Sequence, residues 1–369
     1  MRIRAISILA VLTLILAACS PGTDAGNTAT SQPDESASTT TTLAPTSTDA
    51  PDAMRLAYKL TPGTSYEYEV GLDQTMELTA EGDSAALGED DIPGEASIHI
   101  VGTTTFTHSV SEGPEPGTFE INITGDFTDL EFTGTMDGQP IEDGEIPDFT
   151  GVEPIDITIV VDEQGNVIPQ DEATADLLGE LGDMGGFGDI AGAGTDPGRF
   201  VGPPFAEDEV TVGDTWSETI EVPGMSEDQA ITTEVTSEVT ATDTVDGHDV
   251  FVIDTTSVTS AIEFDLAEFL IGFFMAFIPD DATSEDTAEL DAIMEDLRFL
   301  FSIDETTSNL TTWFDFEAGL ARQAEFDSST HLVMDLNMPD EETSEMIGFV
   351  MDMSVEQHVT YKLTDSSEA

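Results

Sequence analysis

The chain has 369 residues, with 77 acidic residues against only 8 lysines and arginines, so its formal net charge is −69 at pH 7. A surface this acidic repels phosphate groups, which excludes nucleic-acid binding and disfavours contact with anionic lipid headgroups. Diffuse acidity suits a saline medium, in which salt screens the self-repulsion. Structural calcium is the alternative explanation, although the aspartate spacing of an EF-hand is absent.

The N-terminus has the pattern of an export signal. Residues 1–18 contain two early arginines, a short apolar run and the small pair Ala17-Ala18, and Cys19 follows as the single cysteine of the chain. Such a pattern predicts a secretory signal peptide, and its apolar run is shorter than the roughly 20 residues of a membrane span. A cysteine placed after two small residues resembles the bacterial lipobox. The resemblance implies that Cys19 is lipidated and anchors an extracytoplasmic protein to the cell membrane, whereas an ordinary signal peptide with an incidental cysteine is the alternative.

Residues 19–53 are predicted to be a disordered tether. They consist mainly of Ser, Thr, Pro, Ala and Asp and contain almost no large apolar residue. Such a segment buries too little surface to offset the entropy lost on ordering. For a flexible chain of this length, the tether would hold the following domain roughly 30 Å from the membrane.

The remaining chain is predicted to be mainly β within the α+β class, with antiparallel, curved sheets. Alternating polar and apolar residues, rich in Thr, Val, Ile and Phe, predict strands. These runs cover residues 65–78, 96–110, 118–135, 155–162, 231–242, 250–264, 306–316, 321–336 and 349–363. The Asp-Gly pairs at 137–138 and 246–247 predict tight turns between neighbouring strands.

Two related β-units are predicted, at residues 54–170 and 205–365, with a flexible acidic and Gly-rich connector at 171–204. Gly63-Thr64-Ser65-Tyr66 opens the first unit, and Gly213-Asp214-Thr215-Trp216 opens the second. Each unit later contains a strand that ends in Asp before a glycine turn, at Gly165 and Gly319. The spacings between these glycines are similar, 165 − 63 = 102 and 319 − 213 = 106. Generic hairpin sequence is the alternative explanation.

A helical insertion is predicted within the second unit, at residues 265–301. Residues 266–278 are apolar on nearly every side of a helix, and residues 285–301 carry an apolar stripe. We expect one or two helices to pack on the concave face of the sheets and to line a cavity for an apolar ligand with Phe264, Phe269, Phe273, Phe274 and Met275. A helix that merely fills the core, or one that dips into the membrane surface, is the alternative.

Motifs for catalysis are missing from the sequence. The five histidines lack the H-E-x-x-H spacing of a metalloprotease, and no G-x-S-x-G nucleophile elbow is present. Without cysteines in the domain, a zinc site would need ligands from distant parts of the chain. We therefore predict a non-enzymatic protein without a cofactor or a metal site.

Short motifs connect the chain with bacterial lipoproteins. The opening L-x-P-G-x-x-Y-x-Y, from Leu60 to Tyr68, and V-G-D-T-W at 212–216 resemble a group of uncharacterised bacterial lipoproteins, actinobacterial in type. The expected architecture is similar to the LolA/LprG-type lipoprotein carriers, in which a curved sheet closed by helices holds acyl chains. This resemblance implies a membrane-anchored lipoprotein that binds a lipid or another apolar ligand.

Two further functions are compatible with parts of the sequence. A cell-envelope scaffold or protein-interaction module would have a filled core instead of a cavity. The substrate-binding component of a transporter would consist of two α/β lobes, which the β-rich pattern disfavours.

Overall fold

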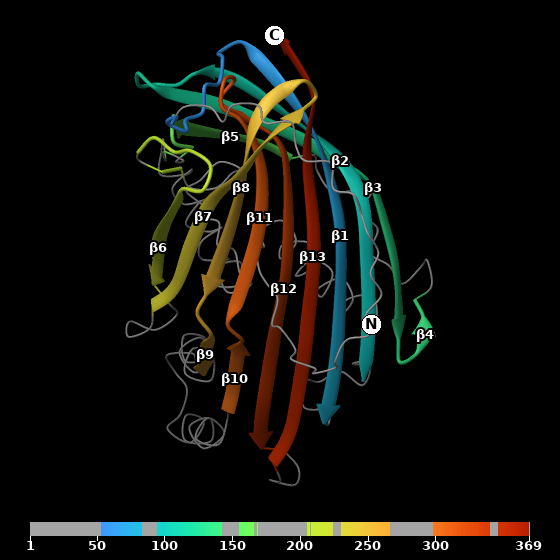
Figure 1. The fold of residues 1–369 in the computed structure, drawn as a ribbon. Helices are drawn as coiled ribbons and strands as arrows, with labels where there is room; N and C mark the ends of the chain where they lie inside the picture. Colours follow the sequence, from blue (N-terminus) through green and yellow to red (C-terminus); the bar gives the residue numbers. More distant parts are fainter. Residues whose placement is uncertain are drawn as a thin grey trace, which may run out of the picture.

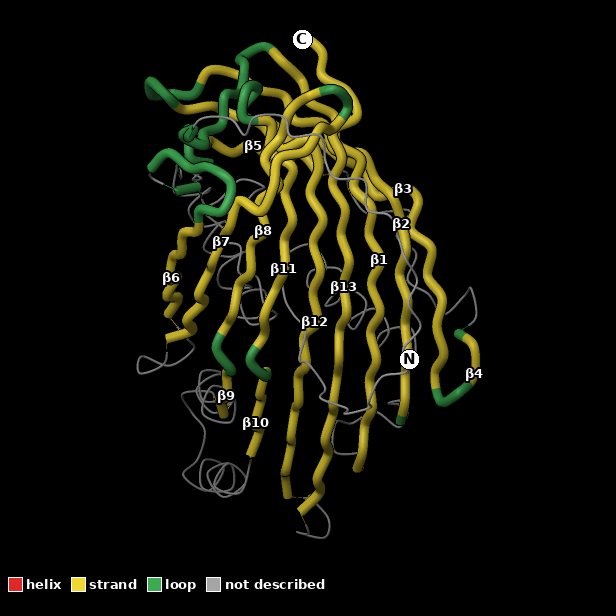
Figure 2. Tube along the Cα trace, in the orientation of Figure 1, coloured by secondary structure: helices red, strands yellow, loops and turns green. Residues whose placement is uncertain are grey.

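The computed structural model describes residues 53–82, 94–141, 155–165, 168, 205–206, 208–223, 230–265, 298–339 and 346–368. Within these ranges the chain forms strands, turns and extended segments, and no helix is present (Figure 2). In the same ranges there is accordingly no helix with the length and apolar character needed to cross a membrane. The predicted mainly-β fold is confirmed.

The strands form one antiparallel sheet in the order β4-β3-β2-β1-β13-β12-β11-β8-β7-β6 (Figure 1). Off this path, β5 pairs with β3, while β10 pairs with both β12 and β9. The bounds are β1 (Thr64–Gly82), β2 (Glu95–Glu112), β3 (Thr118–Met136), β4 (Gln139–Pro140), β5 (Ile155–Asp162), β6 (Thr215–Pro223), β7 (Ala230–Val245), β8 (His248–Thr259), β9 (Ile262–Asp265), β10 (Arg298–Ile303), β11 (Thr306–Asp315), β12 (Leu320–Pro339) and β13 (Met346–Glu368).

The first and last strands lie side by side at the centre of the sheet. Their antiparallel ladder extends from Thr64, opposite Glu368, to Gly82, opposite Phe349. Because of this pairing, the strands of the first half and those of the second form a single continuous sheet. The first half lies on one side of the β1–β13 ladder, and the second half lies on the other.

The predicted Asp-Gly turns are confirmed. Asp137 and Asp246 have φ angles of 50° and 49°, and the glycines that follow them have φ angles of 72° and 86°. Two successive residues with positive φ match the right-handed twist of the flanking strands, and a glycine at the second position adopts this conformation without strain.

The two halves open with equivalent turns. Gly63 N–H donates to the Val110 carbonyl at 2.8 Å, and Gly213 N–H donates to the Val239 carbonyl at 2.7 Å. Both glycines have positive φ. Strands β1 to β5 follow the first of these turns, and β6 to β11 follow the second.

The helical prediction is wrong where it falls on described residues. Residue 265 ends β9, and residues 298–301 belong to β10, which pairs with β12 along Arg298–Ile303. The reason is that Phe301 and Ile303 alternate with less buried neighbours and face the same side as β12 residues such as Leu332. Pairing with β12 therefore determines the conformation of these residues, although their apolar spacing also suits a helix. The remaining residues of the predicted helices lie outside the described ranges.

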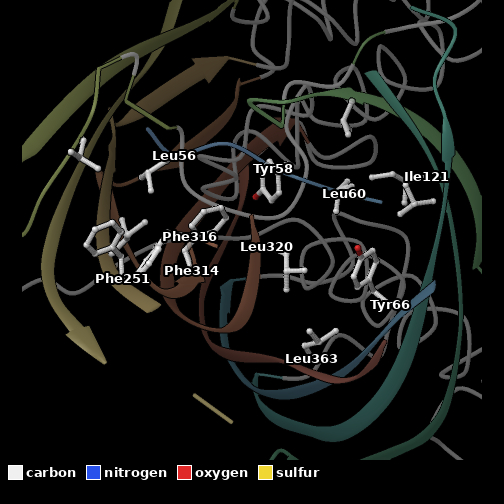
Figure 3. Packing of buried hydrophobic residues seen from close by; sticks show 14 of the residues in the cluster. Leu56, Tyr58, Leu60, Tyr66, Ile121, Phe251, Phe314, Phe316, Leu320 and Leu363 are labelled. Atoms are coloured by element: carbon white, nitrogen blue, oxygen red, sulfur yellow. The ribbon is translucent and has the colours of Figure 1, made fainter. Parts of the chain in front are cut away.

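Alternation along the strands gives the curved sheet a buried concave face and an exposed outer face. Near the ends of the strands drawn at the top of Figure 1, the concave face carries the upper cluster, part of which is drawn in Figure 3. Its buried members are Leu56, Tyr58, Leu60, Tyr66, Val110, Ile121, Val161, Val210, Val239, Phe251, Ile253, Phe314, Phe316, Leu320 and Leu363. Further down, the same face carries the lower cluster, Met76, Ile231, Ile262, Phe301, Ile303, Leu332, Met353 and Val355.

Candidate ligand-binding face

The upper end of the concave face is filled by residues 54–60, the segment just before β1. Tyr58 N–H donates to the Glu163 carbonyl at 2.7 Å, and Lys59 N–H donates to the Gly319 carbonyl at 3.0 Å. The segment is thereby held by the glycine turns of both halves. Leu56, Tyr58 and Leu60 alternate inward and are buried, while the ring of Tyr58 meets Phe314 edge-on with centroids 5.9 Å apart (Figure 3).

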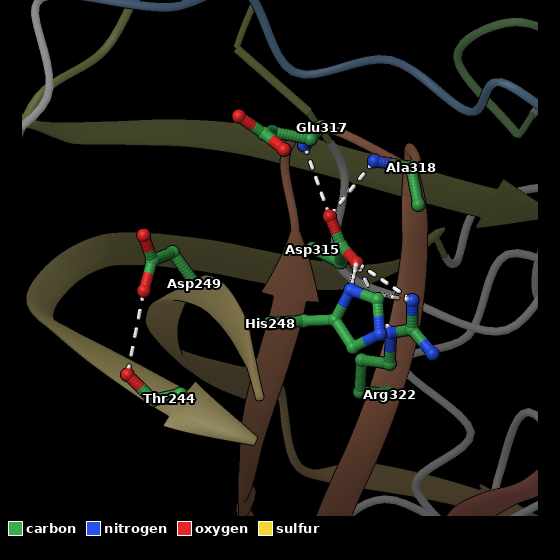
Figure 4. A network of polar contacts seen from close by, with 7 residues as sticks. All are labelled: Thr244, His248, Asp249, Asp315, Glu317, Ala318 and Arg322. Atoms are coloured by element: carbon green, nitrogen blue, oxygen red, sulfur yellow. Dashed lines mark hydrogen bonds and ion pairs between the residues drawn. The ribbon is translucent and has the colours of Figure 1, made fainter. Parts of the chain in front are cut away.

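A buried carboxylate holds the second of these glycine turns together (Figure 4). Asp315, whose side chain is 2% exposed, accepts hydrogen bonds from the backbone N–H groups of Glu317 and Ala318 at 3.0 and 2.8 Å. Arg322 donates to its other oxygen from Nε at 3.1 Å and from Nη2 at 2.8 Å. His248 Nδ1 lies 3.3 Å from the same oxygen. Each oxygen of the buried charge is therefore paired, as a buried ion requires.

Tyr68 and His108 pack together just below the upper cluster. Their ring centroids are 4.8 Å apart, and burial lowers the pKa of His108 to about 4, so its ring is neutral at pH 7. Burial also raises the pKa of the Tyr68 phenol, which lies 3.4 Å from the Ala321 carbonyl. The cavity beside them measures about 20 Å³, which is room for a single water molecule. This cavity among the described residues is too small for a lipid.

A polar band crosses the concave face between the two ends. It joins six strands and consists of Gln74, Thr233, Ser257, Thr259, Thr306, Ser308, Ser328, Thr330 and Gln357, all of them buried. On β1 and β13, Gln74 lies directly opposite Gln357, which in turn lies opposite Ser328 of β12. Above this row are the apolar residues Val70, Phe326 and Val359, and below it is the lower cluster.

The polar band is only partly satisfied by hydrogen bonds. At the β7 side, Thr233 and Thr259 share a hydroxyl–hydroxyl hydrogen bond of 3.0 Å. On β12, Ser328 Oγ lies 3.5 Å from Gln357 Oε1. By contrast, neither the amide nitrogen nor the amide oxygen of Gln74 has a hydrogen-bond partner, and neither does Thr306 Oγ1. A buried polar group left in this way destabilises a fold, so it needs an explanation.

The lower cluster is buried too, with side chains that are 0–8% exposed. Among the described strands, those that touch extensively are all neighbours within the sheet, so no second layer of strands packs over this cluster. Its side chains are long and apolar, with two methionines among them. Methionine adapts its shape to an irregular apolar partner.

The predicted site residues are only partly within the described ranges. Phe264 lies on β9, where its backbone pairs with Phe301 of the lower cluster. Cys19, Phe269, Phe273, Phe274 and Met275 lie outside the described residues. The prediction of a cavity lined by these aromatic residues therefore stays a prediction.

The polar band was missed, although its signal is visible in the sequence. In β1 the buried positions are Tyr66, Val70, Gln74, Met76 and Leu78, so a glutamine occupies the apolar phase of the strand. In β13 the same happens with Gln357 between Val355 and Val359. A polar residue in the buried phase of two strands can be recognised once their register is known.

The outer face has a different chemistry, built on histidine–aspartate pairs. His99 lies 2.8 Å from Asp73, and His358 lies 2.8 Å from Asp327. An open groove of about 480 Å³ runs along this part of the face and is lined mostly by polar and acidic side chains. Among the described residues, no group of three or more His, Cys, Asp or Glu side chains is arranged to hold a metal ion. These pairs are exposed and mutually satisfied, so the concave face is the better candidate site.

Comparisons with known proteins add little to this picture. No protein-family model matches the chain, and no curated protein does. Among solved structures, one described as "lipid-protein interactions in lipovitellin" covers 84% of this chain with 11% identity and a TM-score of 0.32. An outer membrane channel from Pseudomonas putida F1 covers 82% of this chain and 97% of its own length, with 7% identity and a TM-score of 0.17. The chain spans only 26% of the lipovitellin chain, and likenesses this low carry no conclusion about function.

Proposed function

We propose that this protein is a membrane-anchored, extracytoplasmic lipoprotein that binds a lipid or another apolar ligand on the concave face of its sheet. The observation that carries the proposal is the lower cluster, an apolar surface built from β1, β7, β9, β10, β12 and β13. Burying apolar surface drives binding at about 25 cal/mol per Å². Acyl chains are suitable partners for such a surface because they follow its shape without making polar contacts.

The anchoring part of the proposal depends on the N-terminal sequence. An apolar run, a small pair and Cys19 resemble a lipobox, and the Ser/Thr-rich residues that follow suit a tether. A carrier or sensor of lipids needs access to a membrane surface, and an N-terminal acyl anchor would provide it. The similarity to LolA/LprG-type carriers is part of this proposal.

The two halves are proposed to be related units. Their equivalent opening turns at Gly63 and Gly213 support this relation, and so do the glycine turns at Gly165 and Gly319, each of which follows a strand that ends in Asp. Two such units, joined through the β1–β13 ladder, would form the single sheet whose concave face is proposed to bind the ligand.

The second candidate function is a cell-envelope scaffold with a filled core. The packing of the upper cluster favours it, because the cavity there holds no more than a water molecule. A scaffold would carry no lipid after purification, whereas a lipid-binding protein would retain one.

Native mass spectrometry of protein purified from its own membrane tests the proposal. We expect a co-purifying lipid, together with binding of a fluorescent fatty-acid probe by the delipidated protein. Absence of both would rule the function out and leave the scaffold.

A matched pair of substitutions on β1 locates the binding surface. Met76→Gln places an amide in the lower cluster, while Glu77→Gln places the same side chain on the outer face. We expect only Met76→Gln to weaken probe binding, by about tenfold, since it buries a polar group against acyl chains. Equal effects of the two substitutions would place the probe elsewhere.

A further inference from the structure

We propose that the polar band selects lipids with an uncharged, hydrogen-bonding head, such as a diacylglycerol, and discriminates against anionic lipids. The inference rests on the proposed function and specifies its ligand: the acyl chains would lie on the lower cluster, and the ester and hydroxyl groups of the head would lie on the band.

The unpaired groups of the band supply the recognition. Gln74 is 1% exposed and Thr306 is 3% exposed, and their polar side-chain atoms have no hydrogen-bond partner. A primary amide offers two donors and a carbonyl acceptor, and a hydroxyl offers one donor and two lone pairs. These groups match the hydroxyl and ester oxygens of an uncharged glycerol lipid, and such a ligand would remove the cost of leaving them unpaired.

The register places these groups within reach of one head. Gln74, Gln357 and Ser328 form a row across three adjacent strands, which lie about 4.8 Å apart. Thr330 and Thr306 belong to the same band on β12 and β11. Because Met76 and Val355 lie two residues further along β1 and β13, on the same face, the step from head to chains is about 7 Å.

The charges of the described residues argue against an anionic head. Four of the five lysines and arginines in the described ranges, Arg55, Lys59, Arg298 and Lys362, are exposed. The fifth, Arg322, is engaged by Asp315 in the upper end. Among the described residues, therefore, no cation belongs to the polar band or to the lower cluster. A phosphate buried there would have no counter-charge, in a chain whose net charge is −69.

Ligand competition tests this selectivity. The full chain, delipidated, is loaded with an uncharged pyrene-labelled hydrocarbon, which is then displaced by dioleoylglycerol, dioleoyl phosphatidic acid or n-hexadecane. The first two share their acyl chains and differ by one phosphate, while hexadecane has no head at all. We expect dioleoylglycerol to displace the probe at a concentration about tenfold lower than phosphatidic acid requires.

Variants of the polar band distinguish the contribution of the lipid head to affinity from that of the acyl chains. In the double variant Gln74→Leu/Thr306→Val, dioleoylglycerol should lose about tenfold in affinity while hexadecane keeps its own. Thr75→Val, on the outer side of the same strand, serves as the control and should change neither affinity.

The outcomes distinguish the two proposals. If the labelled hydrocarbon does not bind and none of the three lipids does, the proposed function fails and the head selectivity fails with it. If they bind but phosphatidic acid equals or exceeds dioleoylglycerol, or if the double variant keeps its affinity for dioleoylglycerol, the head selectivity alone is overturned. The band would then be a hydrated structural feature of a lipid-binding protein.

Discussion

The two ends of the concave face handle buried polar groups in opposite ways. At the upper end, the buried carboxylate of Asp315 is paired at both oxygens by backbone N–H groups and by Arg322. In the polar band, the buried amide of Gln74 has no partner at all. The upper end is covered by the segment that contains Tyr58, whereas no described strand lies over the lower cluster. The upper end is thus completed by the protein itself, whereas the unpaired amide in the lower part is the basis of the proposed ligand site.

Removal of Asp315 should have the largest effect on stability. Asp315→Ala would leave Arg322 and two backbone N–H groups without their acceptor, so we expect a loss of about 3–5 kcal/mol in the free energy of unfolding. Asp254→Ala is the control, since Asp254 is exposed and accepts a hydrogen bond from Thr311 at 2.8 Å. Urea unfolding followed by circular dichroism measures both. A loss below about 1 kcal/mol at Asp315 would mean that the upper end does not depend on this pairing.

Acid should weaken the upper end through His108. Its pKa is near 6.5 in the unfolded chain and about 4 in the fold, so the unfolded state binds the proton preferentially between these values. The contribution of the neutral ring to the stability of the fold is therefore complete above pH 6.5. As the pH falls to 4, we expect the free energy of unfolding to drop by about 3 kcal/mol.

Comparison with His108→Phe isolates this contribution from that of the many carboxylates. The difference in unfolding free energy between the two proteins, measured from pH 7.5 to pH 4, should change in favour of the variant as the pH falls. A difference that stays constant would show that His108 is accessible to protons in the folded protein.

Gln74→Leu should change the free energy of unfolding in the opposite direction from Asp315→Ala. Removing an unpaired buried amide without leaving a cavity should stabilise the delipidated protein by about 1–3 kcal/mol. Gln357→Leu, directly opposite on β13, removes the acceptor near Ser328 and should give no such gain. Chemical unfolding of both variants decides the point. Loss of stability in Gln74→Leu would contradict the contrast between the two ends.

The smallest expected effect concerns His331 on the outer face. Hydrogen bonds to Asp304 and to Asp352, at 2.7 and 3.0 Å, raise the pKa of His331. The stabilisation is then fully present below pH 6.5 and is lost as the pH rises through the raised value. Because the side chain is 40% exposed, we expect less than about 1 kcal/mol. His331→Gln should flatten this part of the pH dependence, and 1 M salt should reduce it in the native sequence.

The strands were predictable because one face of the sheet is buried and the other exposed, which requires apolar and polar residues to alternate along each strand. The run predicted at 155–162 coincides with β5, and the Asp-Gly turns fall where the sequence places them. The strand β6, Thr215–Pro223, was missed because its residues between Trp216 and Ile220 are polar. Short β10 was assigned to a helix because Leu297, Leu300 and Phe301 follow helical spacing in the sequence, although Leu300 and Phe301 lie in the strand.

The candidate site was less predictable than the fold. The polar band becomes visible only when register brings Gln74 opposite Gln357, and these residues are 283 positions apart in the chain, since 357 − 74 = 283. The pairing of Asp315 with His248 likewise depends on long-range folding. Local sequence patterns predict burial and turns, but they do not predict which buried groups from distant parts of the chain are in contact.

The ladder between β1 and β13 also sets a condition on the order of folding. During synthesis β1 is made before the other described strands, but its partner on one side, β13, is the last of them. Until then β1 presents an unpaired edge, and the sheet cannot be completed from either half alone. The many negative charges would keep such half-made chains apart from one another. The centre of the sheet can therefore close only after β13 has been made.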